Sequence, residues 1–403
     1  MLRREKLDVK IKQRANIFNW RGQFTPELVE YLLDEFSAPD NVILDPFSGS
    51  GTVLQEALKK DLHAYGFEIN PAAYAMSKFF TFANVELKER QRELDHIAHS
   101  LQKISSKYEN IPVYIYDKEI GFRDAYKNFL NVSREVLAEF SDKSTRLLVV
   151  NMLFKAESLK KLTIAEAIQS GFDYIKNALL QLHFTKAHVQ AFLCDVRDIH
   201  KQIPEKANIV ITSPPYINVF NYHQNYRSLM ELLHFDILHV AKSEFGSNRK
   251  NRGNRFKTVV QYCLDMESAL YSILEALQKD GKVIMIVGRE SNVRRVPFYN
   301  GRIVHQIVDT IPGFKILDTT ERSFCNKFGN NIIEDVLVFK KNGYSENHTE
   351  ARAIAEKSLK KALEYAEKDV KSDIIEAIDG IHTIPHSPRF QTKDLMKHER
   401  VTA

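Results

Sequence analysis

The first clear pattern in the chain is a set of apolar residues at helical spacing, at positions 28, 29, 32 and 33. Thr25 precedes this set as a candidate N-cap, and Pro26 stands at the first helical position, where a proline is well tolerated. The pattern therefore predicts a helix that starts at Pro26. Residues 1–23 are expected to form an irregular, basic lead-in.

A β-α-β unit is predicted directly after this helix. The apolar run 41–44 is typical of a buried strand, and it leads into a glycine-rich turn and a second helix that begins near Thr52. Residues 63–67 have the composition of a second strand, which ends in Glu68. Residues 41–68 are therefore expected to belong to an α/β fold.

More strands are predicted in the second half of the chain. Segments 188–194, 207–211 and 281–287 are apolar runs of strand length. Segments 314–318 and 332–339 are expected to form a closing antiparallel hairpin with a long connection. The alternation of strands and helical segments predicts an α/β fold with a doubly wound, mostly parallel sheet.

Between the two groups of strands the pattern changes to long, charged, amphipathic segments. Helices are expected there at 86–107, 129–140 and 159–182. After the last strand, a Lys- and Glu-rich helix and a polar, mobile tail are expected. The predicted organisation is an N-terminal part of the α/β domain at 1–83, a helical insertion at 84–187, the C-terminal part of that domain at 188–342, and a helical, flexible extension at 343–403.

Size and composition are those of a globular protein. The chain has 403 residues, of which 44% are hydrophobic, so it can bury a large core. Cys194, Cys263 and Cys325 are too few and too scattered for a disulfide framework or a metal site, and we expect all three to be buried thiols. Neither a signal peptide nor an apolar run of membrane-spanning length is apparent, which predicts a cytoplasmic protein.

The turn after the first predicted strand has the sequence Asp45-Pro-Phe-Ser-Gly-Ser-Gly-Thr52. Ligands of open parallel sheets bind beyond the carboxyl ends of the strands, where this turn lies. Gly49 and Gly51 would let the backbone approach a ligand closely, and Asp45 would accept a hydrogen bond or oppose a positive charge. Glu68 ends the next strand 23 residues after Asp45, near the offset at which an acid binds ribose hydroxyls, although a surface acid is the alternative.

A second motif, Ser213-Pro214-Pro215-Tyr216, follows the predicted strand 207–211. Ser213 supplies a hydroxyl acceptor and the Pro214 carbonyl supplies a second acceptor, and two successive prolines fix their directions. Tyr216 supplies an aromatic face. The four residues alone are typical of a loop turn, whereas their place after an apolar strand, in a chain with the glycine-rich turn, predicts a reaction pocket.

Together the two motifs resemble the DNA amino-methyltransferases that use S-adenosylmethionine, in particular the branch with Ser-Pro-Pro-Tyr that methylates the N4 amine of cytosine. The resemblance covers residues 17–83 and 188–340, with the cofactor motif first, whereas the familiar class with this catalytic motif often has the opposite order. It implies a Rossmann-like methyltransferase fold, S-adenosylmethionine as cofactor and double-stranded DNA as partner. It also implies that the target base is flipped out of the duplex.

The resemblance implies further cofactor-binding residues. Asp195 resembles the family's acid near the adenine ring, and its alternative role is an N-cap for the helix that follows. Phe24, Thr25 and Pro26 resemble the family segment that covers the methionine end of the cofactor. The complete set implied for the cofactor is Phe24, Thr25, Pro26, Asp45, Pro46, Phe47, Gly49, Gly51, Thr52, Glu68 and Asp195.

Contacts with DNA are expected after the catalytic motif. Tyr222 is the first candidate for the base pocket, and five cations without an acid lie within residues 249–257, where they would meet phosphates or simply form a solvated loop. The expected set is Tyr222, Arg227, Arg249, Lys250, Arg252, Arg255 and Lys257. The insertion 84–183 and the basic segment 242–262 are the candidates for target recognition. His223 is not assigned as a base, because a methylated cationic amine can lose its proton to water.

Three alternatives stay open. Adenine N6 is a competing target atom, because a serine before the two prolines does not exclude it. RNA methyltransferases acting on guanine N2 share Asp-Pro-x-x-Gly-Ser-Gly-Thr, but they usually have Asp or Asn where this chain has Ser213. A non-catalytic DNA-binding subunit is the alternative from another class. A restriction endonuclease that acts on the same site is a candidate partner.

Overall fold

The computed structural model describes residues 2–10, 12–108, 122–218, 221–247, 251–326, 329–344 and 349–391. Its centre is a seven-stranded sheet with the order β3-β2-β1-β4-β5-β9-β8. Its strands are β1 (Val42–Asp45), β2 (His63–Glu68), β3 (Val189–Leu193), β4 (Ala207–Thr212), β5 (Leu277–Gly288), β8 (Phe314–Cys325) and β9 (Asn331–Lys341). A separate small hairpin consists of β6 (Ser291–Val293) and β7 (Val296–Phe298).

Strand β1 lies at the point where the strand order reverses. It pairs in parallel with β2 on one side and with β4 on the other, so that Leu44 is the partner of both Tyr65 and Val210. Strands β3 and β5 extend the parallel part, and β9 and β8 close it as antiparallel strands. In open α/β sheets a ligand binds beyond the carboxyl ends of the strands at this reversal point, which places a site next to Asp45 and Thr212.

Helices cover both faces of the sheet, as the doubly wound prediction requires. In the first half of the chain they are α1 (Arg4–Leu7), α2 (Pro26–Phe36), α3 (Thr52–Leu58), α4 (Pro71–Phe79), α5 (Leu87–Tyr108), α6 (Phe122–Ala138), α7 (Lys143–Glu157) and α8 (Ile164–Gln181). In the second half they are α9 (Arg227–Leu232), α10 (Ile237–Ser243), α11 (Lys257–Ala276), α12 (Asn300–Thr310), α13 (Ala351–Tyr365) and α14 (Lys368–Asp379). Short 3-10 helices are η1 (Phe80–Asn84), η2 (Val196–Lys201), η3 (Tyr222–Gln224) and η4 (Ile381–Thr383).

Alternate residues of each strand point to opposite faces and into two separate cores. Ile43 and Ile211 pack in the core that contains α2, α3 and α4. Leu44 and Val210 pack in the core that contains α11, α12 and α13. The strands are thus buried on both sides, which explains why their sequences are continuous apolar runs.

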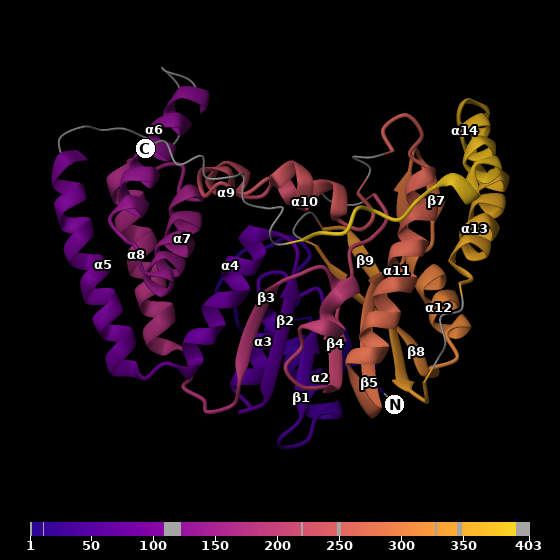
Figure 1. Ribbon diagram of the computed structural model, residues 1–403, viewed down its shortest axis with the longest axis horizontal. Coiled ribbons are helices and arrows are strands. Elements are labelled where there is room, and N and C mark those ends of the chain that lie inside the picture. The colour runs from indigo at the N-terminus through magenta and orange to yellow at the C-terminus, as the bar shows by residue number, and fades with distance from the viewer. Residues whose placement is uncertain are drawn as a thin grey trace.

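Helices α5 to α8 form the insertion predicted between the strands, and they stand beside the β3 edge at one end of the molecule (Figure 1). The sequence patterns do not predict helix α7. Its buried residues, among them Leu148, Val149, Met152 and Phe154, face several directions, so the helix has no amphipathic pattern. Within the described residues, no helix combines the length and apolar composition needed to cross a membrane.

The closing hairpin is confirmed, but the long connection is wrong. Strand β8 continues to Cys325 and β9 begins at Asn331, so the two strands are much longer than their apolar parts. Strand β8 is the edge of the sheet, and its side chains alternate between exposed and partly buried positions, which allows polar residues inside the strand. Cys325 is exposed there, whereas Cys194 and Cys263 are buried as expected.

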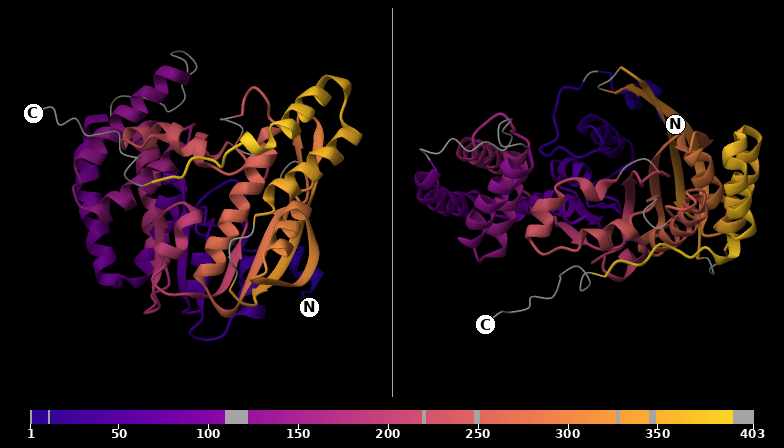
Figure 2. Two further views of the ribbon diagram at one scale, coloured as in Figure 1. Left: turned by 45° about the vertical axis from the view of Figure 1, so that its right-hand side comes forward. Right: turned by 90° about the horizontal axis from the view of Figure 1, so that it is seen from above.

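The C-terminal region has more structure than the predicted single helix and mobile tail. Two helices, α13 and α14, pack beside α11 and α12, and residues 385–391 then cross the molecule towards α10 (Figures 1 and 2). We call residues 385–391 the C-terminal strap. Phe390 in the strap is 4% exposed and packs against Val240, so a sparse set of apolar residues holds a segment that looked polar in the sequence.

Candidate active site

A cavity of about 880 Å³ that opens to solvent lies beyond the carboxyl ends of β1, β2, β3 and β4. Both motifs predicted from the sequence contribute to its walls. The lining residues come from the segments 20–24, 45–50 with Thr52, 67–70, 194–196, Ser213 with Pro215, Tyr222, and 243–245.

The glycine-rich turn makes one wall, but its two glycines have different roles. Gly49 lines the cavity with φ of 50°, and its N–H donates to Glu68 Oε2 over 2.9 Å. Gly51 does not line the cavity, which corrects the expectation that it lies against the ligand. It has φ of 87° at the N-cap of α3, and a Cβ there would lie 2.8 Å from the Phe80 ring, so packing and backbone conformation require glycine.

Asp45 and Glu68 both line the cavity, and Asp45 is buried whereas Glu68 is partly buried. Glu68 accepts hydrogen bonds from the backbone N–H groups of Gly49, Ile69 and Asn70, at 2.9, 2.8 and 2.8 Å. Burial nevertheless raises the pKa of Glu68 to about 7. Burial likewise raises the pKa of Asp45 to about 7, although hydrogen bonds from Thr212 and the Phe47 N–H oppose that shift.

The N-terminal segment covers the cavity on one side. Trp20 and Tyr222 both line it and their rings are stacked, with centroids 6.2 Å apart and an interplanar angle of 15°. Trp20 also lies against Gly49, where a Cβ would come within 3.2 Å of the ring. Trp20 is the chain's single tryptophan, and it is not among the site residues predicted from the sequence. Phe24 lines the cavity, whereas Thr25 and Pro26 do not and serve the start of α2 instead.

The catalytic motif begins where β4 ends, beside the cofactor turn. Thr212 Oγ1 donates to Asp45 Oδ1 over 2.6 Å, so the residue before the motif is bonded to the first residue of the turn. Ser213 and Pro215 line the same cavity as Gly49. Pro214 is buried and does not line it. The two motifs, 167 residues apart in the chain, therefore share one cavity.

Tyr216 does not line the cavity, and its hydroxyl is held by residues from the closing hairpin. Its hydroxyl donates to Glu334 Oε1 over 2.9 Å and lies 3.3 Å from Ser213 Oγ. Its ring packs on Gly288, where a Cβ would come within 2.4 Å of the ring. Arg322 donates to the other oxygen of Glu334 over 2.7 Å. Burial raises the pKa of the Tyr216 hydroxyl well above its usual value, and the charge of Glu334 adds to this shift. No local sequence pattern points to Glu334 or Arg322, because both belong to a hairpin that is distant in the chain.

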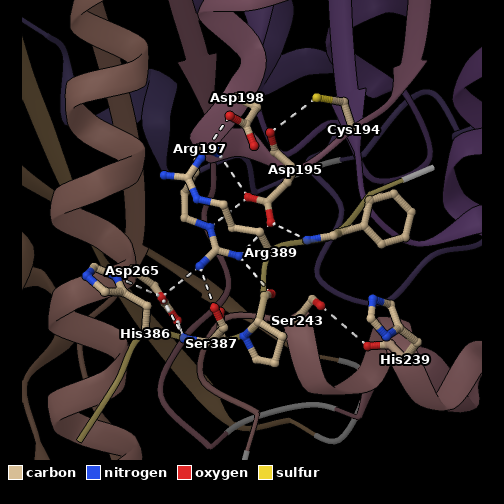
Figure 3. Close-up of polar contacts among 12 residues, drawn as sticks. Cys194, Asp195, Arg197, Asp198, His239, Ser243, Asp265, His386, Ser387 and Arg389 are labelled. Atoms are coloured by element: carbon tan, nitrogen blue, oxygen red, sulfur yellow. Dashed lines mark hydrogen bonds and ion pairs between the residues drawn. The ribbon is translucent and has the colours of Figure 1, made fainter. Parts of the chain in front are cut away.

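Asp195 lines the cavity, but its carboxylate is already occupied (Figure 3). It caps η2 through the backbone N–H of Arg197 and forms an ion pair with the Arg197 side chain, with Nη2 to Oδ2 at 2.5 Å. The structure thus realises the N-cap alternative. Arg197 also binds Asp265 at 3.0 Å and the Ser387 carbonyl at 2.9 Å, and the Phe390 N–H donates to Asp195 over 3.1 Å. The C-terminal strap therefore supports this wall.

The residues expected to contact DNA are dispersed. Tyr222 lies in the cavity wall, and Arg227 begins α9 and pairs with Glu231. Arg252 and Arg255 are exposed beside the start of α11, and Lys257 pairs with Glu376 of α14. Arg249 and Lys250 lie outside the described residues.

Comparisons with known proteins give matches to methyltransferases. The family model of the N6/N4 type, described as DNA methylase, matches residues 4–79. The Type II methyltransferase M.MjaII of Methanocaldococcus jannaschii is 18% identical over 78% of each chain. The Type II methyltransferase M.BsoBI of Geobacillus stearothermophilus is 22% identical over 70% of this chain and 66% of the relative. Among solved structures, TrmN from Thermus thermophilus is 15% identical, with a TM-score of 0.31 over 80% of this chain and 50% of its own.

The reversal of strand order next to two motif-bearing turns is that of a Rossmann-like methyltransferase. Residues 4–79 thus match the DNA methylases of the N6/N4 type, and most of the chain is similar to Type II methyltransferases, which supports an S-adenosylmethionine-dependent DNA amino-methyltransferase.

Proposed function

We propose that this protein methylates the N4 amine of cytosine within a specific sequence of double-stranded DNA. The single observation that carries this proposal is that Ser213 and Pro215 of the catalytic motif line the same cavity as Gly49 and Glu68 of the cofactor motif. A methyl donor and an amine must meet in one enclosed space, and this cavity provides it.

The residues of the cavity fit S-adenosylmethionine. When bound, this cofactor supplies an electrophilic methyl group on a cationic sulfur. Glu68 at the end of β2 is the acid that would accept from ribose hydroxyls, and the Gly49 backbone allows close approach. Val196, Ile69 and Phe245 provide an apolar wall for the adenine ring near the end of β3. We assign Asp45 to the cationic end, because its buried carboxyl group gains most from a nearby positive charge.

The catalytic motif is suited to an amine that is a poor nucleophile. The exocyclic nitrogen of cytosine shares its lone pair with the ring, and hydrogen-bond acceptors on its N–H groups favour the sp3 geometry that reaction requires. We assign the Ser213 hydroxyl as one such acceptor, because Ser213 lines the cavity and Pro214 does not. The hydroxyl of Tyr216, fixed by Glu334, lies 3.3 Å from Ser213 Oγ and so restricts the orientation of the serine.

Access to the amine requires that the target base leaves the duplex. Gly288 lies against the Tyr216 ring, and we assign the remaining surface of that ring to stacking on the flipped base. Exposed cations such as Arg252 and Arg255 are assigned to phosphate contacts, which would make binding depend on salt. Because the two relatives are named Type II methyltransferases, we also propose that the protein is the modification partner of a restriction endonuclease.

The test is mass spectrometry of nucleosides from DNA and RNA incubated with the protein and methyl-labelled S-adenosylmethionine. The proposal predicts labelled N4-methylcytosine from DNA and no label in RNA. Labelled N6-methyladenine would assign the chain to the other target of its family, and labelled N2-methylguanine in RNA would overturn the DNA assignment. A protein that binds the cofactor but transfers no methyl group to any substrate would be a non-catalytic subunit.

A further inference from the structure

Glu244 lines the cavity in addition to Asp45, Glu68 and Asp195, and no local sequence pattern singles it out. Glu244 follows helix α10, lines the cavity and is only 6% exposed. Its Oε2 is 2.9 Å from Nδ1 of His223, which is fully buried. Gln224 Nε2 lies 3.0 Å from the other ring nitrogen of His223. An amide donor at that nitrogen fits the tautomer with hydrogen on Nδ1, which then donates to Glu244.

The second oxygen of Glu244 makes no hydrogen bond of normal geometry within the described part of the chain, and neither does Nδ2 of Asn70. The two side chains are nevertheless close, because a weak hydrogen bond from Asn70 lowers the pKa of Glu244. Asn70 is 2% exposed, lines the cavity, and is fixed because its Oδ1 caps α4 by accepting from the Ala72 N–H. A buried acceptor and a buried donor with unused hydrogen-bonding capacity thus border the same cavity. A ligand that bonds to them would satisfy that capacity.

These atoms lie beside the part of the cavity where the ribose is expected. Asn70 is two residues beyond Glu68, and its backbone N–H donates to Glu68 Oε1 over 2.8 Å. Burial raises the pKa of Glu244, while His223 and, more weakly, Asn70 lower it, so the Asn70 amide is near this carboxylate. The charge of Glu244 also contributes to the raised pKa of Glu68. Both glutamates line the same cavity.

Glu68 alone has too few acceptor sites for a ribose diol. A carboxylate has about four lone-pair sites. Three sites of Glu68 are taken by the N–H groups of Gly49, Ile69 and Asn70. Two ribose hydroxyls can donate two hydrogen bonds, so a second acceptor is needed, and Glu244 Oε1 has unused hydrogen-bonding capacity.

We propose that the ribose diol of the cofactor is bound between two carboxylates, with one hydroxyl donating to Glu68 and the other to Glu244 Oε1. Asn70 Nδ2 donates to a ribose oxygen on the same wall, and His223 is the positioning residue that holds Glu244. This inference rests on the cofactor assignment of the proposed function but not on the target base. It gives the buried His223–Glu244 pair a role in cofactor recognition.

The experiment measures affinity for S-adenosylhomocysteine and for its 2′-deoxy and 3′-deoxy analogues by calorimetry. In Glu244→Gln, His223 keeps an acceptor only if the amide oxygen turns towards it, which places the NH2 group in the cavity and replaces an acceptor with a donor. Affinity for S-adenosylhomocysteine should fall about 10- to 100-fold, the range for a hydrogen bond to a charged group. The analogue that lacks the hydroxyl bound by Glu244 should bind the native protein with similarly reduced affinity. In the variant, this analogue should bind no more weakly than S-adenosylhomocysteine.

Glu157→Gln is the matched control. Glu157 on α7 is a partly buried glutamate with one bonded oxygen, to Tyr126, and one buried oxygen without a partner in the described residues, but it does not line the cavity. Its substitution should leave affinity unchanged.

Native affinity for S-adenosylhomocysteine in Glu244→Gln, or equal losses for the parent compound and both deoxy analogues, would overturn the proposal. So would a loss confined to the sulfonium S-adenosylmethionine, because that would indicate recognition of charge. The native protein with the two analogues provides a test that needs no variant, since equal affinity for all three compounds also contradicts the proposal. Failure of the native protein to bind S-adenosylhomocysteine would overturn the cofactor cavity as well. Methylation of adenine instead of cytosine would leave this inference intact.

Discussion

Thr212 donates a 2.6 Å hydrogen bond to Asp45, and this bond joins the catalytic motif to the cofactor motif. Asp45 is the last residue of β1 and Thr212 is the last residue of β4. Because these strands are parallel neighbours at the reversal of strand order, their carboxyl ends emerge side by side. The relative position of the two motifs is thus set by the sheet and not by flexible loops.

Replacement of Thr212 should show how much this bond contributes. Thr212→Val keeps the shape of the side chain but leaves the buried Asp45 carboxyl without its side-chain donor. We expect the free energy of unfolding to fall by about 1–3 kcal/mol, because a buried polar group loses its partner. Thr212→Ser, which keeps the hydroxyl, is the control and should retain most of the stability in urea denaturation. Equal stability of the valine variant would show that the bond adds nothing.

Substitutions in the catalytic motif should separate turnover from cofactor binding. Ser213→Ala removes the proposed acceptor for the amine, and we expect turnover to fall about 100- to 1,000-fold, the cost typical of one lost catalytic hydrogen bond. Tyr216→Ala should also lower turnover severely, through loss of the ring and of its link to Glu334. Affinity for S-adenosylhomocysteine should change less than about threefold in both variants, because both side chains are assigned to the target base and not to the cofactor. Full activity in either variant would contradict its assigned role.

Cofactor affinity should depend on pH through the carboxyl groups of Asp45 and Glu68. Burial raises the pKa of Asp45 and of Glu68 to about 7, so below pH 7 both are largely protonated in the empty cavity. The ionised forms interact better with a cation and with hydroxyl donors, so binding should release protons in this range. Affinity should be highest above pH 7 and fall by up to about tenfold per pH unit and per acid between pH 7 and 5. Calorimetry at several pH values tests this, and constant affinity from pH 5 to 8 would contradict it.

The C-terminal strap should contribute to stability through Arg197. Arg197 is 2% exposed. Its side chain pairs with Asp195 and Asp265 and donates to the Ser387 carbonyl. Arg197→Met would leave two buried carboxylates without their cation, at a cost of about 3–5 kcal/mol of unfolding free energy. Lys201→Met is the control on the same short helix, because Lys201 pairs with Asp198 at an exposed position. Chemical denaturation that ranks the two variants equally would contradict a structural role for the Arg197 pairs.

Where short-range patterns decide the structure, the sequence was sufficient. The unit from β1 to β2 follows from two apolar runs and one glycine-rich turn, and the start of α2 follows from Pro26. The same patterns placed Glu68 and Ser213 at strand ends, and the reversal of strand order then brought them to one cavity.

Other parts of the site depend on long-range packing and could not be read from local patterns. Glu334 and Glu244 reach their partners from a distant hairpin and from the end of a short helix. Gly51 was grouped with Gly49 because both fit a close approach, but the reason for Gly51 is its contact with Phe80. The C-terminal strap was missed since Phe390 is an isolated apolar residue in a polar segment.

The most direct test of the account is a crystal structure of the protein with S-adenosylhomocysteine. We expect the ligand to occupy the cavity between the turn at Gly49 and Ser213. Its ribose hydroxyls should lie at Glu68 and Glu244, and its sulfur should lie on the side of the catalytic motif. A ligand bound elsewhere on the molecule, or in this cavity with its sulfur turned away from Ser213, would contradict the claim that donor and base meet in one site.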